Sequence, residues 1–328
     1  MLENRMIIRA GVKRNKGSFL GIGILLLLAA LSLTAVLMTV LAGNSYIRDE
    51  MERAGFGDLT AWASDVPDIE FLMESIREQE GVEAAEAQRL IFSEYEANGV
   101  ESDSQGQMIP WTLSGSRYRF FQNNLSGYRE APEEIGEQEV YVSPSMKSMM
   151  DLEPGDTVIF PIARGGRTIS LTVAGYYEDP FMGSSMIGMK GFLISEKTYE
   201  EIGSIIEETG MDALARDGVM VHIQAEDGIT VSEVNRILVE NTPLSMYTEF
   251  IHSADTMAGF MGILQNAFSA ILAAFALVLF GVAMAVMGHS ISGLVEQEWK
   301  NLGILKTMGY TGGRLTGLLT IQYGAAMG

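Results

Sequence analysis

The chain has 328 residues, 47% of them hydrophobic, and a formal net charge of −20. The charge is uneven: residues 1–17 carry +4, residues 44–256 carry −25 and residues 257–328 carry +1. An acidic middle repels phosphate, which argues against a nucleic-acid partner. The absence of cysteine excludes a disulfide framework and fits an exported bacterial domain that relies on its own core.

Residues 1–17 are predicted to form a cytoplasmic amphipathic elbow helix. Arg5, Arg9, Lys13 and Lys16 recur at spacings of four and three, which places them on one helix face. Such a helix lies in the headgroup layer, with its cations near anionic lipids. The alternative is the charged start of a signal peptide, but the apolar core that follows is too long for one.

Residues 18–43 are predicted to form the first transmembrane helix. The stretch from 17 to 47 has no charged residue, and its apolar core of 25 residues is long enough to span a bilayer with some tilt. Basic residues precede this core and acidic residues follow it. By the positive-inside rule, the N-terminus is cytoplasmic and residues 44–256 are extracytoplasmic.

Residues 44–256 are predicted to form an α+β domain. Residues 58–64 are apolar and prone to form a strand, and residues 85–98 suggest a second strand. Between them, Ile69, Leu72 and Ile76 recur at helical spacing over residues 68–82. The domain therefore opens with a strand, a helix and a strand.

A small β-rich, barrel-like subdomain is expected at about residues 98–212. Residues 98–135 suggest long loops, whose aromatic residues are expected to pack against a sheet rather than to form a binding cluster. Strands are predicted within residues 139–144, 153–162, 167–179 and 191–195, a short helix at 143–152, and a helix capped by Ser195. A strand at 219–224 and a helix at 230–241 follow. The aromatic residues are Trp111, Tyr118, Phe120 and Phe121.

No catalytic constellation is found in the sequence. The histidines stand at 222, 252 and 289 without metal-ligand spacing, and His222 suits a surface or part-buried strand position better than a base. The chain has no P-loop motif for binding ATP. We therefore expect no enzyme, no metal and no cofactor, with ATP bound by a partner.

The second transmembrane helix is predicted at residues 257–288, inside a run of 40 uncharged residues between Asp255 and Glu296. Residues 289–313 are predicted to form an amphipathic helix on the cytoplasmic side that ends at Gly309. Residues 314–328 begin a third apolar run of insufficient length to span a bilayer. A fragment of a longer protein, ending within its third transmembrane helix, is therefore expected.

Three segments carry a resemblance to a known family. The sequence NLGILKTMGYTGGRLTGLL from residue 301 resembles the [R/K]-E-[I/L]-G-[I/L]-L-[K/R]-x-[L/M]-G loop of the FtsX-like/MacB-type ABC transporter permeases. Residues 9–31 resemble the start of that family, and residues 139–180 resemble its extracytoplasmic domain. One departure is Asn301, which stands where the family has an acidic residue, with Glu298 one turn earlier.

The resemblance implies a membrane protein with transmembrane α-helices and a MacB-like periplasmic core domain of α+β fold. It implies a multi-pass protein of the bacterial cell membrane that works with a cytoplasmic ABC ATPase and with a second permease half or a second copy. ATP hydrolysis would move the outer domain for export, lipoprotein or peptide handling, or envelope regulation, by mechanotransmission. The extracytoplasmic substrate or partner stays open. The residues implied in ATPase coupling are Glu298, Trp299, Asn301, Leu302, Gly303, Leu305, Lys306 and Gly309.

The alternative is a two-span sensor or receptor with an extracellular ligand-binding domain. Its architecture is equally compatible with the sequence as far as Trp299. A receptor would continue into a polar coiled coil or a kinase rather than a third apolar run. A membrane-anchored enzyme is disfavoured because the catalytic constellation is missing.

Overall fold

The computed structural model describes residues 16–112 and 118–297, together with positions 303, 304, 306, 307, 309, 311–313 and 317. The chain divides into two compact units: Met1–Gly43 with Leu264–Gly328, and Asn44–Ile263. Apart from Lys16 and Gly17, the predicted elbow helix lies outside the described residues. The same holds for the predicted third apolar helix, of which Gly317 alone is described.

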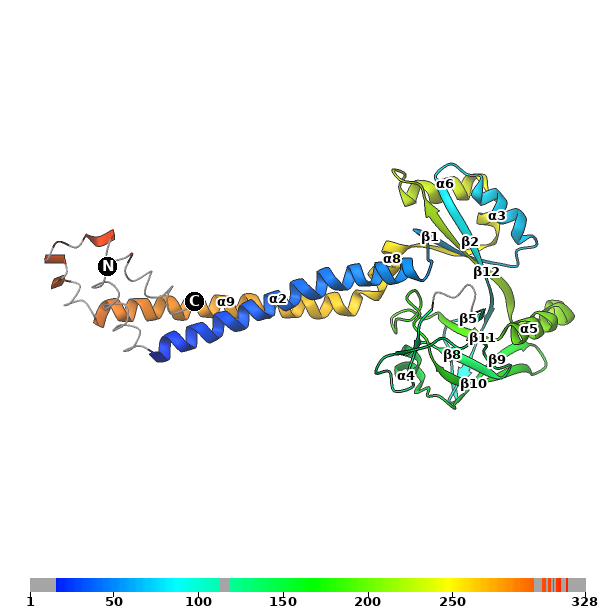
Figure 1. The fold of residues 1–328 in the computed structure, drawn as a ribbon, viewed down its shortest axis with the longest axis horizontal. Helices are drawn as coiled ribbons and strands as arrows, with labels where there is room; N and C mark the ends of the chain where they lie inside the picture. The colour runs from blue at the N-terminus through cyan, green and yellow to red at the C-terminus, as the bar shows by residue number, and fades with distance from the viewer. Residues whose placement is uncertain are drawn as a thin grey trace. The chain divides into compact units, whose positions relative to one another are not determined.

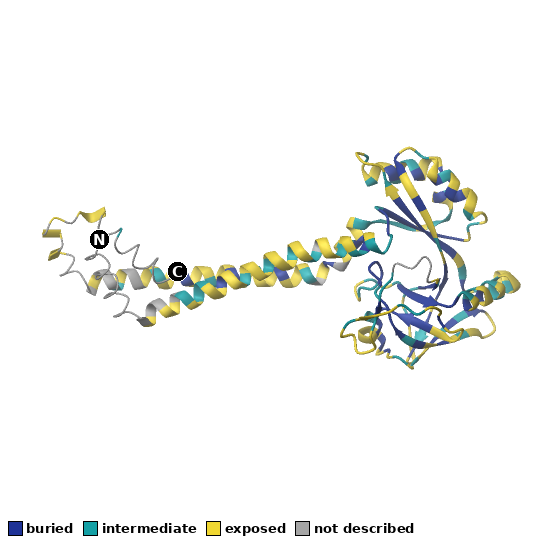
Figure 2. Cartoon of the chain, viewed as in Figure 1, coloured by how far each residue is buried: buried dark blue, intermediate teal, exposed yellow. Residues whose placement is uncertain are grey.

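Two long helices carry the apolar segments, α2 (Lys16–Arg53) and α9 (Ile263–Gln297). Both are long and apolar enough to cross a membrane. Figure 2 shows that most residues of both helices are exposed. Large apolar side chains such as Leu31 and Leu277 are among the exposed ones. Apolar side chains on all sides of an exposed helix are typical of a segment surrounded by lipid.

The two helices touch near one polar side chain. The Gln265 side-chain amide donates to the Thr39 carbonyl at 2.6 Å. A Cβ at Gly43 would lie within 2.6 Å of the Gln265 side-chain amide, so a larger residue there would displace this amide. Small residues that let backbones approach, and polar groups that bond across helices, are the usual basis of helix pairing in membranes.

The unit Asn44–Ile263 is built on an 11-stranded mixed sheet in the order β13-β1-β12-β2-β5-β11-β8-β10-β9-β3-β4 (Figure 1). A further two-stranded sheet holds β6 (Phe120–Phe121) and β7 (Tyr128–Arg129). The strands of the large sheet are β1 (Leu59–Ser64), β2 (Val82–Ser93), β3 (Glu96–Ala97), β4 (Val100–Glu101), β5 (Gly106–Pro110), β8 (Glu139–Val142), β9 (Thr157–Ala163), β10 (Arg167–Tyr176), β11 (Lys190–Ile194), β12 (Arg216–Ala225) and β13 (Thr248–Ser253).

Helices α3 (Ile69–Arg77) and α6 (Val231–Asn241) cover the end of the sheet formed by β1, β12 and β2 (Figure 1). The predicted strand-helix-strand start is confirmed as β1, α3 and β2, although β12 pairs between the two strands. The predicted helix face is also confirmed, because Leu72 and Ile76 are buried and Ile69 is half-buried. Asp68 caps α3 by accepting a hydrogen bond from the Phe71 N–H at 2.9 Å.

Helices α4 (Ser145–Met150) and α5 (Glu196–Thr209) accompany the other half of the sheet, and Met146 and Ile202 enter its core. The predicted Ser195 cap is confirmed, since its hydroxyl accepts from the Thr198 N–H at 3.0 Å. The predicted strands β8 to β12 are confirmed as well. Strands β5, β11, β8, β10 and β9 lead in this order from β2 to β3, and β3 follows β2 in the chain after two residues. This half of the sheet therefore curls back on itself, as the predicted barrel-like subdomain requires.

Strand β5 was predicted as part of a loop, and its central place in the sheet corrects that prediction. It pairs with β2 and, in parallel, with β11. A Cβ at Gly106 would lie 2.7 Å from the Phe192 ring, so packing in this strand requires glycine. Glycine is uncommon inside strands, which is why the sequence suggested a loop here. Strand β13 was also missed, because residues 243–256 suggest a connection. The aromatic residues behave as predicted: Trp111 and Phe120 are buried and pack edge to face at 4.9 Å.

The remaining short elements lie around the sheet. A 3-10 turn, η2 (Gly210–Asp212), follows α5, and α7 (Leu244–Tyr247) precedes β13. Helix α8 (Ala254–Met261) begins directly after β13, with the Ser253 hydroxyl accepting from the Thr256 N–H at 3.2 Å. The break between α8 and α9 falls at Gly262, inside the segment 257–288 that was predicted as one helix.

Candidate functional site

The chain enters and leaves the unit Asn44–Ile263 on neighbouring strands. After α2 it enters through β1, and it leaves through β13, which is antiparallel to β1 with Leu59 opposite Ser253. Ala254 is the first residue of α8, and its backbone N–H donates to the Asp58 carbonyl at 2.9 Å. The two ends of the domain are therefore joined by backbone hydrogen bonds at one edge of the sheet, which we call the junction.

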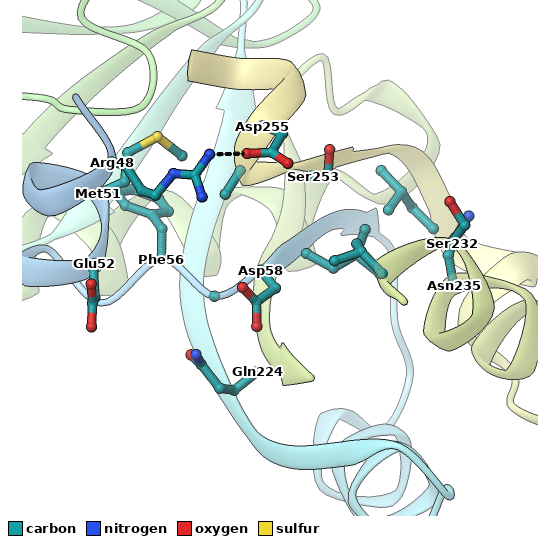
Figure 3. Close-up of a pocket in the computed structure, with 15 residues that line it drawn as sticks. Arg48, Met51, Glu52, Phe56, Asp58, Gln224, Ser232, Asn235, Ser253 and Asp255 are labelled. Carbon is teal, nitrogen blue, oxygen red and sulfur yellow. Dashed lines mark hydrogen bonds and ion pairs between the residues drawn. The ribbon is translucent and has the colours of Figure 1, made fainter. Parts of the chain in front are cut away.

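The junction surrounds a cavity of about 600 Å³. Figure 3 shows Arg48, from the last turns of α2, reaching Asp255 of α8, and the two side chains form an ion pair of 2.7 Å. Asn235 of α6 also lines the cavity, and its Oδ1 atom is buried without a partner among the described residues. The other polar lining residues are Glu52, Asp58, Gln224, Ser232 and Ser253.

The chemistry of this lining favours binding or positioning over catalysis. The lining holds no His, Lys or Cys that could act as a base or nucleophile near neutral pH. The Asp58 carboxylate is also occupied, since its Oδ2 accepts from the Ala225 N–H at 3.0 Å. Because the Arg48 and Asp255 side chains are 67% and 76% exposed, their ion pair contributes little stability and can open readily.

A second group of charges holds the last turns of α2 to the β-rich part of the domain. We call it the charged cluster, and its carboxylates, Glu50 and Glu178, are only 13% and 16% exposed. The Arg119 guanidinium bonds Glu178 at 2.6 Å and also Glu50, while Arg53 bonds Glu50 at 2.7 Å and Glu178 at 3.2 Å. The members of the cluster are Tyr46, Glu50, Arg53, Arg119, Tyr128 and Glu178.

Two tyrosines complete the charged cluster. The Tyr128 hydroxyl donates to Glu178 Oε1 at 2.8 Å, and the Arg119 guanidinium lies 4.4 Å from the centre of the Tyr128 ring. The pKa of Tyr128 is raised mainly by burial, and the neighbouring Glu178 carboxylate raises it further. Each carboxylate thus has several charged or hydroxyl donors, so the end of α2 is fixed to this part of the domain.

A buried acid and a buried base shape the loop between β10 and β11. Asp179 accepts from the Met182 N–H at 2.7 Å and from the Tyr177 hydroxyl at 3.1 Å. Burial raises the pKa of Asp179, although these hydrogen bonds oppose the shift. Burial lowers the pKa of Lys190 to about 8, against the attraction of Asp179. The Lys190 ammonium donates to three carbonyl oxygens of this loop, those of Met182, Ser184 and Ile187.

The structure describes three of the eight residues predicted to couple to an ATPase. Gly303 and Lys306 are helical and exposed. Gly309 adopts a φ of +94°, the left-handed geometry expected where glycine ends a helix. The coupling role itself stays a prediction. The other five residues, Glu298, Trp299, Asn301, Leu302 and Leu305, lie outside the described residues.

Sequence reasoning missed the junction and the charged cluster. Arg48 and Asp255 are 207 positions apart, and Arg119 and Glu178 are 59 apart, so no local pattern connects them. The prediction that His222 lies on a strand is confirmed, but its side chain is buried rather than at the surface or part-buried. Its ring nitrogens lie 3.1 Å from the Thr60 hydroxyl and 3.3 Å from the Gln88 side-chain oxygen. Among the described residues, no group of three His, Cys, Asp or Glu side chains could hold a metal ion.

Comparison with known proteins gives a weak structural likeness to a solved domain. No protein-family model matches this chain, and no curated protein matches it. Among solved structures, the chain is similar to the extracellular domain of the noncanonic ABC-type transporter YknZ from Gram-positive bacteria. The match has 14% sequence identity and a TM-score of 0.27, and it covers 59% of this chain and 98% of that domain. A TM-score of this size assigns neither fold nor function, so the function has to be argued from the chain's own residues.

Proposed function

We propose that this chain is the permease subunit of an ABC transporter in a bacterial cell membrane, where a cytoplasmic ATPase moves the extracytoplasmic domain. The observation that carries the proposal is the pairing of β1 with β13 at the junction. Both connections to the domain meet at adjacent strands, so a displacement of either connection acts on the same edge of the sheet. A domain that responds to its two connecting helices needs this arrangement.

The sequence supports the cytoplasmic half of the proposal. Helices α2 and α9 flank the acidic unit and are long and apolar enough to cross a membrane, with basic residues before the first. The segment that begins at Asn301 resembles the coupling loop of FtsX-like permeases. In the proposed mechanism, Leu302 and Leu305 contact the ATPase, and the movement passes along the second apolar helix to α8 and β13. A second copy or a second permease half completes the transporter.

Purification of the tagged full-length protein from native membranes tests the partner. An ATPase with a P-loop should co-purify, and a histidine kinase or other signalling protein in its place would favour the sensor. The coupling is tested by ATPase activity in lipid vesicles. The variant L302A/L305A should lower that activity at least fivefold, whereas M246A, on an exposed methionine of the outer domain, should leave it unchanged. Equal activities of L302A/L305A and wild type would refute the coupling role.

A further inference from the structure

A second cavity of the domain has an unusual sulfur content. It has a volume of about 240 Å³ and lies between the loop that joins β10 to β11, the edge strand β13 and helix α8. Four of its eight lining side chains are methionines, and one is a histidine. No carboxylate lines it. The lining residues are Met182, Met186, Ile187, Met189, Phe250, His252, Met257 and Phe260.

The loop that supplies three of these thioethers is held in place by buried polar groups. Asp179 accepts from the Met182 N–H at 2.7 Å, and the Lys190 ammonium donates to the Met182 carbonyl at 3.2 Å and to the Ser184 carbonyl at 2.6 Å. Met182 is buried and Met186 is 50% exposed, so the cavity has both a rigid wall and an opening to solvent. A site whose ligand groups are already fixed loses little entropy when it binds.

His252 is available as a ligand. The part of the chain that the structure describes offers no hydrogen bond to its ring, which is surrounded by Trp62, Phe250 and Phe260 at centroid distances of 6.1, 5.5 and 6.2 Å. The contrast with His222 is direct, because both ring nitrogens of His222 have polar neighbours. A half-buried neutral imidazole whose ring accepts no hydrogen bond from the protein leaves a nitrogen lone pair for a ligand.

Thioethers discriminate between cations. They are soft ligands that select Cu(I), whereas Mg²⁺, Ca²⁺ and Mn²⁺ prefer carboxylate and carbonyl oxygens. Imidazole also suits copper. We propose that Met182, Met186, Met257 and His252 form a binding site for a soft monovalent cation, Cu(I) or its analogue Ag(I). Met189, whose sulfur accepts from the Gln107 side-chain amide, completes the thioether lining. In a chain without cysteine, methionine is the soft ligand that the sequence provides.

Binding is measured on the full-length chain in detergent, without an ATPase, so the result is independent of the proposed transport function. Ag(I) is titrated calorimetrically, and Cu(I) is offered under anaerobic conditions in competition with a chromogenic chelator. The wild type should bind one equivalent of either ion, and X-ray absorption should show sulfur ligands and one nitrogen ligand. Zn²⁺ should not compete. The absence of Ag(I) and Cu(I) binding would overturn the proposal.

The variant M182L/M186L/M189L removes three thioethers and nearly preserves side-chain volume. It should bind Ag(I) at least tenfold more weakly than the wild type, while M149L/M211L, on exposed methionines elsewhere, should bind as the wild type does. If the triple variant fails to fold, M186L replaces it, since that side chain is half exposed. Unchanged Ag(I) affinity of a folded variant would overturn the proposal. It would also be overturned if the wild type bound an apolar dye but neither Ag(I) nor Cu(I).

Discussion

At the residue scale, Lys190 is a fully buried lysine whose ammonium group ends among carbonyl oxygens. Its pKa is lowered to about 8 by burial, while an unfolded lysine titrates near about 10.4. Between these two values the unfolded chain binds more protons than the folded chain does. The free energy of unfolding therefore rises with pH from about 8 to about 10.4 through this residue.

The first prediction concerns K190L, which has no titratable group at this position. Relative to this variant, the wild type should gain stability as the pH rises through that window. At neutral pH the variant should still be the less stable protein, by about 1–3 kcal/mol, because carbonyl oxygens in the loop lose their donor. Urea unfolding, followed by tryptophan fluorescence at several pH values, measures both effects. A pH-independent difference between the two proteins would show that Lys190 does not titrate in this range.

The cavity residues show how residue-scale prediction fails. His252 and the methionines from 182 to 189 have no ligand-like spacing in the sequence, since His252 is on an edge strand and the methionines are in a loop. The sequence contains the three loop methionines at spacings of four and three, which is a weak signal by itself. Their meeting with His252 depends on where β13 joins the sheet.

At the scale of elements, the connection from α2 to β1 depends on a close approach of two backbones. A Cβ at Gly57 would lie 2.7 Å or less from backbone atoms of Ile223 in β12. Backbone atoms in a central strand cannot move aside without loss of ladder hydrogen bonds. The position therefore requires glycine for space rather than for its backbone angles.

The second prediction follows from this packing. G57A should lower the free energy of unfolding by about 1–3 kcal/mol, as expected for overpacking. The matched control is G203A in helix α5, where a Cβ would meet no atom within 4 Å and where alanine is the better helix former. The control should be stabilised by up to about 1 kcal/mol. Urea unfolding compares the two, and equal effects of both substitutions would contradict this account of the turn.

At the scale of the whole molecule, the charged cluster holds residues 46–53 of α2 to loops that are distant in the sequence. Glu50 and Glu178 are mostly buried, and Arg119 bonds both. A buried carboxylate that loses its partner keeps the cost of its desolvation. The cluster therefore behaves as a unit, and its members should not contribute independently.

The third prediction is a double-mutant cycle on R119A and E178A. The coupling energy should be about 1–2 kcal/mol, within the range for residues of one network. The same cycle on R236A and E240A, an exposed pair on α6 at 3.0 Å, should give no more than about 0.5 kcal/mol. High salt should reduce the exposed pair's coupling more. Additive effects of R119A and E178A would show that the cluster does not fix the end of α2.

The sequence by itself determined many of the local elements and their order, although it did not reveal β5 or β13. Periodicity identified α3, hydropathy identified two apolar helices, and the capping role of Ser195 was readable because a helix start depends on neighbours within four residues. It also predicted the coupling segment beyond Gln297, which remains a prediction.

Only the tertiary structure decided which distant segments meet. It placed Gly106 in a central strand, paired β1 with β13, joined Arg119 to Glu178 and brought His252 to the methionine loop. Each of these contacts depends on sheet order, and sheet order is fixed by packing that local propensity does not encode. The physical reason is that strand pairing is non-local. Where a strand lies in the sheet is determined by the strand it pairs with, and not by its own neighbours in the sequence.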